Sequence, residues 1–122
     1  NRWTVAWIDW NLILDEIGGP NHVGNYCSAP IIVDTNTQEI LYQSSYYYLG
    51  HFSRFINRGD RIIECENKTD NLLALASIND SGIVTTVVMN KKDTQADCTY
   101  MNGKNILPLS IPARSIVTLV NA

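Results

Sequence analysis

The second half of the chain is a series of short apolar segments separated by turn-forming residues, and this pattern constrains the fold most. The segments cover residues 61–66, 72–78, 83–89, 98–101, 106–111 and 115–120. Between them stand Asn79-Asp80-Ser81-Gly82, Asn102-Gly103 and Pro112-Ala113, which favour tight reversals of the backbone. Several short strands at this spacing are typical of a β-sandwich, so residues 60–122 are expected to form one.

The first part of the chain is organised differently. Residues 3–10 alternate bulky and small side chains, which predicts a buried strand, and Gly-Gly-Pro-Asn at residues 18–21 predicts a loop. Residues 29–33 and 39–42 predict a hairpin. Residues 45–57 repeat apolar side chains at three- and four-residue steps, which predicts the one helix. A lone strand and a helix with a wide apolar face need further partners, so the chain is expected to begin inside a longer protein.

The composition excludes several classes of function. With 122 residues, the chain is too short for a whole α/β barrel of about 250 residues. Nine scattered Lys and Arg against twelve Asp and Glu argue against nucleic-acid binding. No apolar run approaches the roughly 20 residues that cross a bilayer. The three cysteines have no Cys-x-x-Cys spacing, so free thiols are expected rather than a metal site or a disulfide framework.

Two tripeptides fit the acceptor motif for N-linked glycans: Asn67-Lys68-Thr69 and Asn79-Asp80-Ser81. Glycans on Asn67 and Asn79 would mark a protein of the secretory pathway. Such tripeptides also arise by chance, so they predict secretion only together with other features.

The block with the clearest functional chemistry combines aromatic, carboxylate and amide side chains. It reads Trp7-Ile8-Asp9-Trp10-Asn11, then Gly18-Gly19-Pro20-Asn21, then Gly24-Asn25-Tyr26. Sugars bind flat aromatic faces through their C–H bonds, while amides and carboxylates bind their hydroxyls, so these residues are suited to a sugar site. An alternative interpretation has Trp7 and Trp10 in a core and Asp9 capping a loop.

Three stretches carry a resemblance to a known family: "WIDWNLILDEIGGPNHVGNY", "APIIVD" and "YYYLGHFSRFINRGDRI". They resemble the C-terminal region of the animal lysosomal glucosylceramidases of glycoside hydrolase family 30. The resemblance implies a mainly β chain. Residues 1–11 resemble the eighth strand of a TIM (β/α)8 barrel, and residues 12–44 resemble part of a small β-sheet. Residues 45–59 resemble the last barrel helix, and residues 60–122 an Ig-like β-sandwich.

The resemblance also implies an activity and a set of site residues. Family members hydrolyse a β-glucosidic bond with retention, using two glutamates on barrel strands that precede Asn1. The chain alone is therefore expected to contain no catalytic residue and to be inactive. By resemblance, Trp10 lines the glucose pocket, Asn25 reaches it from the following loop, and Asp9 forms hydrogen bonds at its floor. His22 stands where lysosomal members carry Trp in "GGPNWV", which would thin the aromatic surface at the site mouth.

The implied partners and location follow from the same resemblance. The parent enzyme is expected to cleave glucosylceramide to glucose and ceramide, without a cofactor or metal, in the lysosome or after secretion. It would be peripheral to the membrane, with no transmembrane segment. The rest of the barrel is the expected partner of this chain, and an activator protein or an anionic lipid surface could contact residues 91–93.

Two further expectations concern the chain by itself. The apolar helix face and the unpaired strand predict that the isolated chain self-associates. The alternative function is a stand-alone β-sandwich that binds glycans or a partner protein without catalysis.

Overall fold

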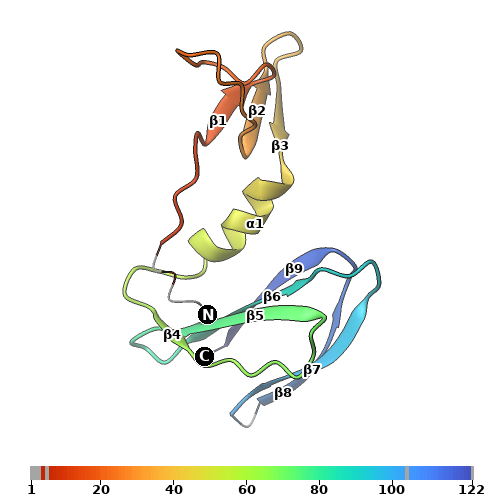
Figure 1. Ribbon diagram of the computed structural model, residues 1–122. Helices are drawn as coiled ribbons and strands as arrows, with labels where there is room; N and C mark the ends of the chain where they lie inside the picture. The colour runs from red at the N-terminus through yellow and green to blue at the C-terminus, as the bar shows by residue number, and fades with distance from the viewer. Residues whose placement is uncertain (1–3, 5, 104, 122) are drawn as a thin grey trace. The chain divides into compact units, whose positions relative to one another are not determined.

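The computed structural model describes residues 4, 6–103 and 105–121. The chain forms two compact units, residues 1–50 and residues 51–122 (Figure 1). The boundary falls inside helix α1 (Ser44–Ser53), whose last residues belong to the second unit.

The first unit contains a three-stranded sheet in the order β1-β2-β3. Strand β1 (Ile13–Asp15) pairs in parallel with β2 (Ile31–Asp34), and β2 pairs antiparallel with β3 (Glu39–Tyr42). The β2–β3 hairpin was predicted from the sequence. Strand β1 was not, because three residues are too few for an alternating pattern to be recognised. The buried apolar side chains of this unit are Leu14 and Ala29.

Residues 4 and 6–10 form no strand in the structure, although the alternation of side chains predicts one over residues 3–10. They are exposed, and Ile8 has an exposed fraction of 91%. A strand persists only where its N–H and C=O groups pair with a neighbouring strand, and this segment has no such pairing within the described part of the chain. Trp3 and Val5 lie outside the described residues. The assignment of residues 1–11 to an eighth barrel strand therefore stays a prediction.

Helix α1 ends at Ser53, earlier than the predicted end at residue 57. A turn follows in which the carboxylate of Asp60 accepts a hydrogen bond from the N–H of Asn57 at 2.8 Å. Gly59, with φ of 98°, lies in this turn and does not cap the helix directly. The helix has no buried residue, so the apolar face predicted to pack against a large partner is at most partly covered.

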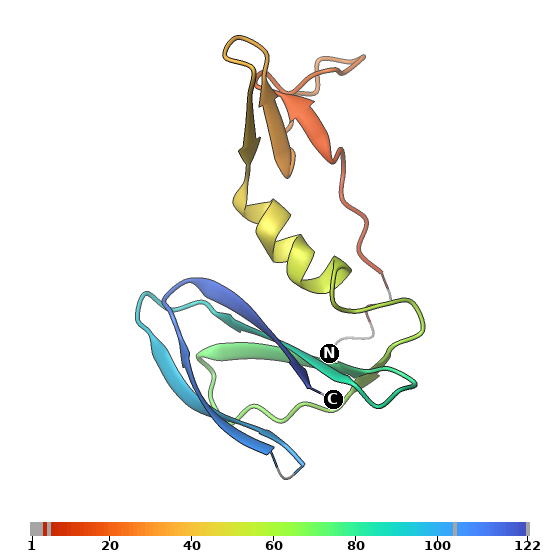
Figure 2. The same cartoon turned by 180° about the vertical axis from the view of Figure 1, so that it is seen from behind.

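The second unit is a β-sandwich, as the sequence predicts (Figure 2). A four-stranded antiparallel sheet in the order β4-β5-β6-β9 packs against the antiparallel pair β7-β8. The strands are β4 (Arg61–Ile63), β5 (Leu72–Ile78), β6 (Val84–Asn90), β7 (Ala96–Asn102), β8 (Asn105–Ile111) and β9 (Ser115–Asn121). Strand β4 is shorter than expected and ends at Ile63, whereas the apolar run continues to residue 66.

The two sheets enclose the core of the sandwich. Leu72, Val88 and Ile111 form its buried centre, and Leu109 of β8 and Val117 of β9 pack against them. These residues come from both sheets, so each sheet covers the inner face of the other. The core thus arises entirely from residues of this unit.

The opposite face of the four-stranded sheet contacts the segment that begins with the end of α1. Nδ1 of His51 lies 2.8 Å from Oγ1 of Thr118 on β9. The hydroxyl of Thr85 on β6 donates a hydrogen bond to the carbonyl of Phe55 at 3.3 Å. Two strands of the sheet therefore hold the last turn of the helix, through His51, and the segment after it, through Phe55.

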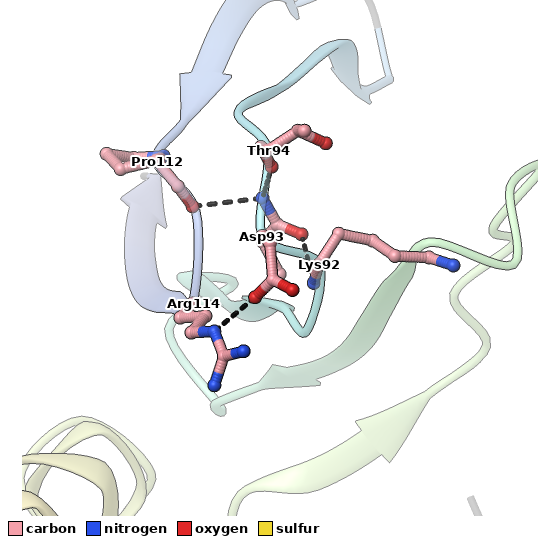
Figure 3. Close-up of polar contacts among 6 residues, drawn as sticks. Lys92, Asp93, Thr94, Pro112 and Arg114 are labelled. Atoms are coloured by element: carbon pink, nitrogen blue, oxygen red, sulfur yellow. Dashed lines mark hydrogen bonds and ion pairs between the residues drawn. The ribbon is translucent and has the colours of Figure 1, made fainter.

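A buried amide joins the β6–β7 turn to the β8–β9 turn. Asn90 is 1% exposed, and its Nδ2 lies within hydrogen-bond distance of the carbonyls of Thr94 (2.8 Å), Pro112 (2.9 Å) and Ile111 (3.2 Å). Its Oδ1 accepts a hydrogen bond from the N–H of Lys92 at 3.0 Å. Figure 3 shows Thr94, Pro112 and Lys92 around this junction. One side chain therefore fixes two turns that are distant in the sequence.

Candidate functional site

The Gly-Gly-Pro-Asn loop is organised by Asp15, the last residue of β1. Its Oδ1 accepts hydrogen bonds from the N–H of Ile17 at 3.1 Å and of Gly19 at 2.5 Å. The backbone of Asp15 closes the same turn, because its N–H donates to the carbonyl of Gly19 at 2.7 Å and its carbonyl accepts from Gly18 at 3.1 Å. This role of Asp15 was not predicted from the sequence.

Gly18 is required where the loop passes its own return segment. It is buried and has φ of 81°, and a Cβ there would lie 2.8 Å from the carbonyl oxygen and 2.9 Å from the nitrogen of Cys27. A larger residue would meet fixed backbone atoms as well as an unfavourable backbone conformation. Asn21 also donates a side-chain hydrogen bond to the carbonyl of Gly18 at 3.2 Å. Residues 18–27 are thus folded closely upon themselves.

The structure holds two of the three predicted sugar-binding residues together. The N–H of Trp10 donates a hydrogen bond to Oδ1 of Asp9 at 2.9 Å, and the Trp10 side chain is 68% exposed. Asn25 is exposed in the loop that Asp15 organises. No hydrogen bond between Asn25 and either Asp9 or Trp10 occurs among residues 4, 6–103 and 105–121. The three residues share the first unit, and Asp9 and Trp10 are sequence neighbours joined by this hydrogen bond.

The aromatic side chains of this region are open to solvent. Trp7 is 74% exposed and Tyr26 is 71% exposed, as Trp10 is at 68%. The alternative interpretation that places Trp7 and Trp10 in a core of this chain is therefore wrong. His22 is exposed as well, at the position where the resemblance led us to expect a tryptophan. The exposed rings present flat apolar faces of the kind that stack on sugars.

Two carboxylates near the loop have structural hydrogen bonds. The carboxylate of Glu16 accepts bonds from the N–H of Thr35 at 2.9 Å, the hydroxyl of Thr35 at 2.8 Å and Nδ2 of Asn36 at 2.9 Å. The bond from the Thr35 backbone lowers the pKa of Glu16. The N–H groups of Thr37 and then Asn36 lower the pKa of Asp34. A general acid needs a raised pKa, so neither group is tuned for that role. The Asp-Thr-Asn-Thr run after β2 is the sequence signal for this turn.

Among residues 4, 6–103 and 105–121, no group of three or more His, Cys, Asp or Glu residues is placed to bind a metal ion. Over the same residues, no helix combines the length and apolar character that a bilayer span requires. Cys27, Cys65 and Cys98 are free thiols that are each half-buried, and burial raises the pKa of Cys65.

The two acceptor asparagines for glycans both lie in connections of the sandwich. Oδ1 of Asn67, between β4 and β5, accepts a hydrogen bond from the N–H of Thr69 at 3.2 Å. Oδ1 of Asn79, between β5 and β6, accepts bonds from the N–H groups of Ser81 at 3.0 Å and Ile83 at 2.9 Å. Side chains that bond to the backbone two residues later are typical of tight turns.

The basic pair of the β6–β7 turn is solvated, as predicted. Lys91, Lys92 and Asp93 are all exposed. Asp93 forms an ion pair with Arg114 of the β8–β9 turn (Figure 3). The Asp93–Arg114 ion pair joins the same two turns that the buried side chain of Asn90 connects.

Comparison with known proteins places this geometry in a family. Residues 1–56 match the glycosyl hydrolase family 30 TIM-barrel domain, and residues 61–119 match the glycosyl hydrolase family 30 β-sandwich domain. The second match coincides with the observed sandwich. The first includes the Trp10 segment, the Asp15 loop and helix α1.

Individual relatives agree with these matches. A candidate glucosylceramidase of Caenorhabditis elegans is 34% identical over 98% of this chain and 24% of its own length. The lysosomal acid glucosylceramidase of Mus musculus is 37% identical over 78% of this chain and 19% of its own length. The crystal structure of SrfJ from Salmonella typhimurium superposes with a TM-score of 0.85 at 33% identity, covering 92% of this chain and 25% of SrfJ.

The chain therefore spans about a quarter of the length of the relatives it matches, 24% for the Caenorhabditis protein. Its two halves match two domains of one family, in the order that the family resemblance implies. The chain belongs to glycosyl hydrolase family 30 and corresponds to the C-terminal region of its glucosylceramidase-like members.

Proposed function

We propose that the whole protein is a retaining β-glucosidase that hydrolyses glucosylceramide to glucose and ceramide. In this proposal the present chain supplies one wall of the sugar pocket and the accessory β-sandwich. The main supporting observation is the exposed Trp10, hydrogen-bonded through its backbone to Asp9 in a region that matches the family's TIM-barrel domain. The name of the mouse relative supports the choice of substrate.

The proposed roles follow from the chemistry of each side chain. Trp10 stacks on the C–H face of the glucose ring, and Asp9 and Asn25 bind hydroxyl groups. Retention requires two carboxyl groups about 5 to 5.5 Å apart, one as nucleophile and one as acid and base. We assign both to glutamates on barrel strands upstream of this chain. Glu16 is engaged with Thr35 and Asn36, which argues against it as a substitute.

The exposure of the first unit supports a barrel as its partner. Ile8, Leu12 and Ile13 are 91%, 63% and 51% exposed, as are the aromatic residues of the same stretch. Contiguous exposed apolar side chains mark surfaces that bind another structure. We therefore propose that the rest of the barrel covers the apolar side chains of this stretch that do not line the sugar pocket, Ile8 among them.

The runner-up function is a glycan- or protein-binding sandwich without catalysis. It is favoured by the complete core of the second unit, around Leu72, Val88 and Ile111. It leaves the exposed apolar side chains of residues 6–13 without a role. The glycosidase proposal accounts for both units.

The test is hydrolysis of a fluorogenic β-glucoside at about pH 5, by this chain alone and by the full-length protein. Only the full-length protein should be active. Trp10→Ala and Asn25→Ala should each reduce kcat/KM by about tenfold or more, while Trp10→Phe, which keeps a flat ring, should retain more activity. Activity of the chain alone would disprove the placement of the catalytic glutamates, and an inactive full-length protein would favour the binding module.

We also propose a peripheral membrane contact in the lysosome, or outside the cell after secretion. Lys91 and Lys92 are exposed on one turn and suited to an anionic lipid surface or an acidic activator protein. Sedimentation with vesicles containing phosphatidylserine tests the lipid contact. Lys91→Glu with Lys92→Glu should abolish binding that the unaltered protein shows, and equal binding by both would refute the proposal.

Self-association of the isolated chain is the last part of the proposal. The exposed side chains of residues 6–13 would pair with a second copy when no barrel covers them. Analytical ultracentrifugation at tens of micromolar should show a dimer or larger species. A single monomeric species would contradict this expectation.

A further inference from the structure

The sandwich has a hollow where β5 begins, β6 ends and β7 begins. Its volume is about 280 Å³, close to the lower limit of about 300 Å³ for small-molecule pockets. Leu72 and Ala96 form part of its lining, and Thr69, Asn71, Gln95 and Asp97 contribute polar groups. The hollow therefore suits one small molecule that has both polar and apolar faces.

The hollow adjoins one of the two acceptor asparagines. Nδ2 of Asn67 donates a hydrogen bond to the carbonyl of Leu72, which lines the hollow. Thr69, the third residue of the same acceptor motif, also lines it. The atom to which a glycan attaches is thus hydrogen-bonded to the backbone of a residue that lines the hollow.

The second acceptor site has a different setting. Asn79 belongs to the β5–β6 turn and bonds the N–H groups of Ser81 and Ile83. None of these three residues is among those that line the hollow. The two sites therefore form a natural pair, one beside the hollow and one away from it.

We propose that the hollow binds the first N-acetylglucosamine of an N-linked glycan attached to Asn67. In the attachment step, Nδ2 of Asn67 forms a bond to C1 of a lipid-diphosphate-linked oligosaccharide, loses one proton, and releases the lipid diphosphate. The secretory pathway supplies this donor and its transferase. Nδ2 keeps one hydrogen, which can continue to donate to the carbonyl of Leu72.

The lining matches the chemistry of this sugar. The acetamido methyl group and the C–H face can contact Ala96, which is partly exposed and packs against the buried Leu72 cluster. Asn71 offers both donors and an acceptor to the hydroxyl and acetamido groups. Thr69, which also lines the hollow, adds a hydroxyl that can bind a sugar hydroxyl.

This inference rests on the secretory location proposed above and is independent of the glycosidase activity. Its experiment reads the glycan instead of hydrolysis. A failure of the β-glucosidase assay therefore leaves the glycan test intact, and a failure of the glycan test leaves the enzyme assignment intact.

The test uses the full-length protein, folded and secreted from a eukaryotic host. Glycopeptide mass spectrometry measures occupancy at Asn67 and Asn79, and then the rate at which a peptide N-glycosidase releases each glycan under native conditions. The enzyme must reach the bond at Nδ2, so a bound first sugar should slow release at Asn67 about tenfold or more relative to Asn79. Equal rates at the two sites, or an unoccupied Asn67, would overturn the proposal.

A variant of the lining provides the matched control. Asn71 is exposed, so Asn71→Ala should leave the fold intact. It should speed release at Asn67 towards the rate at Asn79 and leave the rate at Asn79 unchanged. Equal acceleration at both sites would indicate general loosening of the sandwich and would count against a bound sugar.

A last measurement separates the attached sugar from a soluble one. Asn67→Gln protein cannot carry the glycan, and free N-acetylglucosamine should bind it only weakly, because attachment supplies an effective concentration in about the millimolar range. Titration followed by nuclear magnetic resonance measures this affinity. Binding much tighter than millimolar would identify a site for soluble sugars and overturn the proposal.

Discussion

The two units of the chain differ in where their apolar side chains lie. In the second unit, Val88 and Ile111 are 6% and 1% exposed, inside a core made by its own two sheets. In the first unit, Trp7 and Ile8 are 74% and 91% exposed. The sandwich thus buries a core of its own, although side chains such as Met101 and Ile106 stay exposed, whereas the first unit leaves its largest apolar side chains exposed.

The first unit is ordered mainly by polar side chains. Asp15 closes the Gly-Gly-Pro-Asn loop, and Glu16 holds the turn between β2 and β3. Such hydrogen bonds depend on short-range geometry and need little burial. A small sheet can therefore keep its local shape before a larger structure covers it.

The largest effect should come from the sandwich core. Ile111→Ala removes a side chain that is 1% exposed and should lower the free energy of unfolding by about 3 kcal/mol. Ile106→Ala on the same strand is the matched control, because Ile106 is 67% exposed, and it should cost less than about 0.5 kcal/mol. Urea denaturation measures both. Equal costs would mean that the second unit has no core of its own.

The next effect should come from Asn90. Asn90→Ala removes the donors to the carbonyls of Thr94 and Pro112 and should cost about 2 kcal/mol. Asn90→Asp keeps the shape but places an acceptor against those carbonyls, so it should cost at least as much. Thermal unfolding measures the two variants. A well-tolerated Asn90→Asp would contradict the donor role of this side chain.

A smaller effect, the difference between two glycine variants, is expected in the first unit. Gly18→Ala adds a Cβ within 2.9 Å of the Cys27 backbone, whereas Gly24→Ala adds one where nothing lies within 4 Å. Both glycines have positive φ, so both variants carry backbone strain of about 1 kcal/mol. Gly18→Ala should lower the free energy of unfolding by about 1 kcal/mol more than Gly24→Ala does. It should also reduce β-glucoside hydrolysis by the full-length protein more than Gly24→Ala does. Identical behaviour would show that the loop does not need the close approach at Gly18.

The smallest effect concerns Glu16 and depends on pH. Its pKa is lower in the folded chain than the ordinary 4.5, so the folded state holds the proton less tightly than the unfolded state. Its stabilising contribution is therefore complete above pH 4.5 and is lost as the pH falls through the folded pKa. Glu16→Gln should destabilise the chain slightly at neutral pH and progressively less under more acidic conditions. If the difference in unfolding free energy between Glu16→Gln and the unaltered chain did not change with pH, the Glu16 carboxylate would not be the stabilising group.

The sequence predicted the sandwich well because its turns have distinct chemistry. Asn-Asp-Ser-Gly and Asn-Gly mark where strands reverse, and residues 72–78 were predicted with the bounds that β5 has. Strand β1 was not predicted, because it is only three residues long. The run over residues 3–10 stays a prediction, because alternation reports which side chains prefer burial and cannot report whether a neighbouring strand is present to pair with.

The sequence suggested which residues form the candidate site, but it did not show how the loop that carries Asn25 is closed. The resemblance pointed to Asp9, Trp10 and Asn25, and their roles in sugar binding stay predictions. Asp15 was missed because its function depends on a loop that returns to within hydrogen-bond distance of the strand end. A single aspartate in a sequence carries no sign of such a closure.

The closure at Asp15 has a consequence for how the site can change over time. The atoms that define the loop's base belong to the carboxylate of a strand residue and to backbone groups at residues 15–19. Side chains at the tip, such as His22, are absent from that set and are exposed. The tip can therefore be exchanged, tryptophan for histidine or otherwise, while the support beneath it is inherited unchanged. Substrate preference at the mouth of such a site can drift without disturbing how the loop folds.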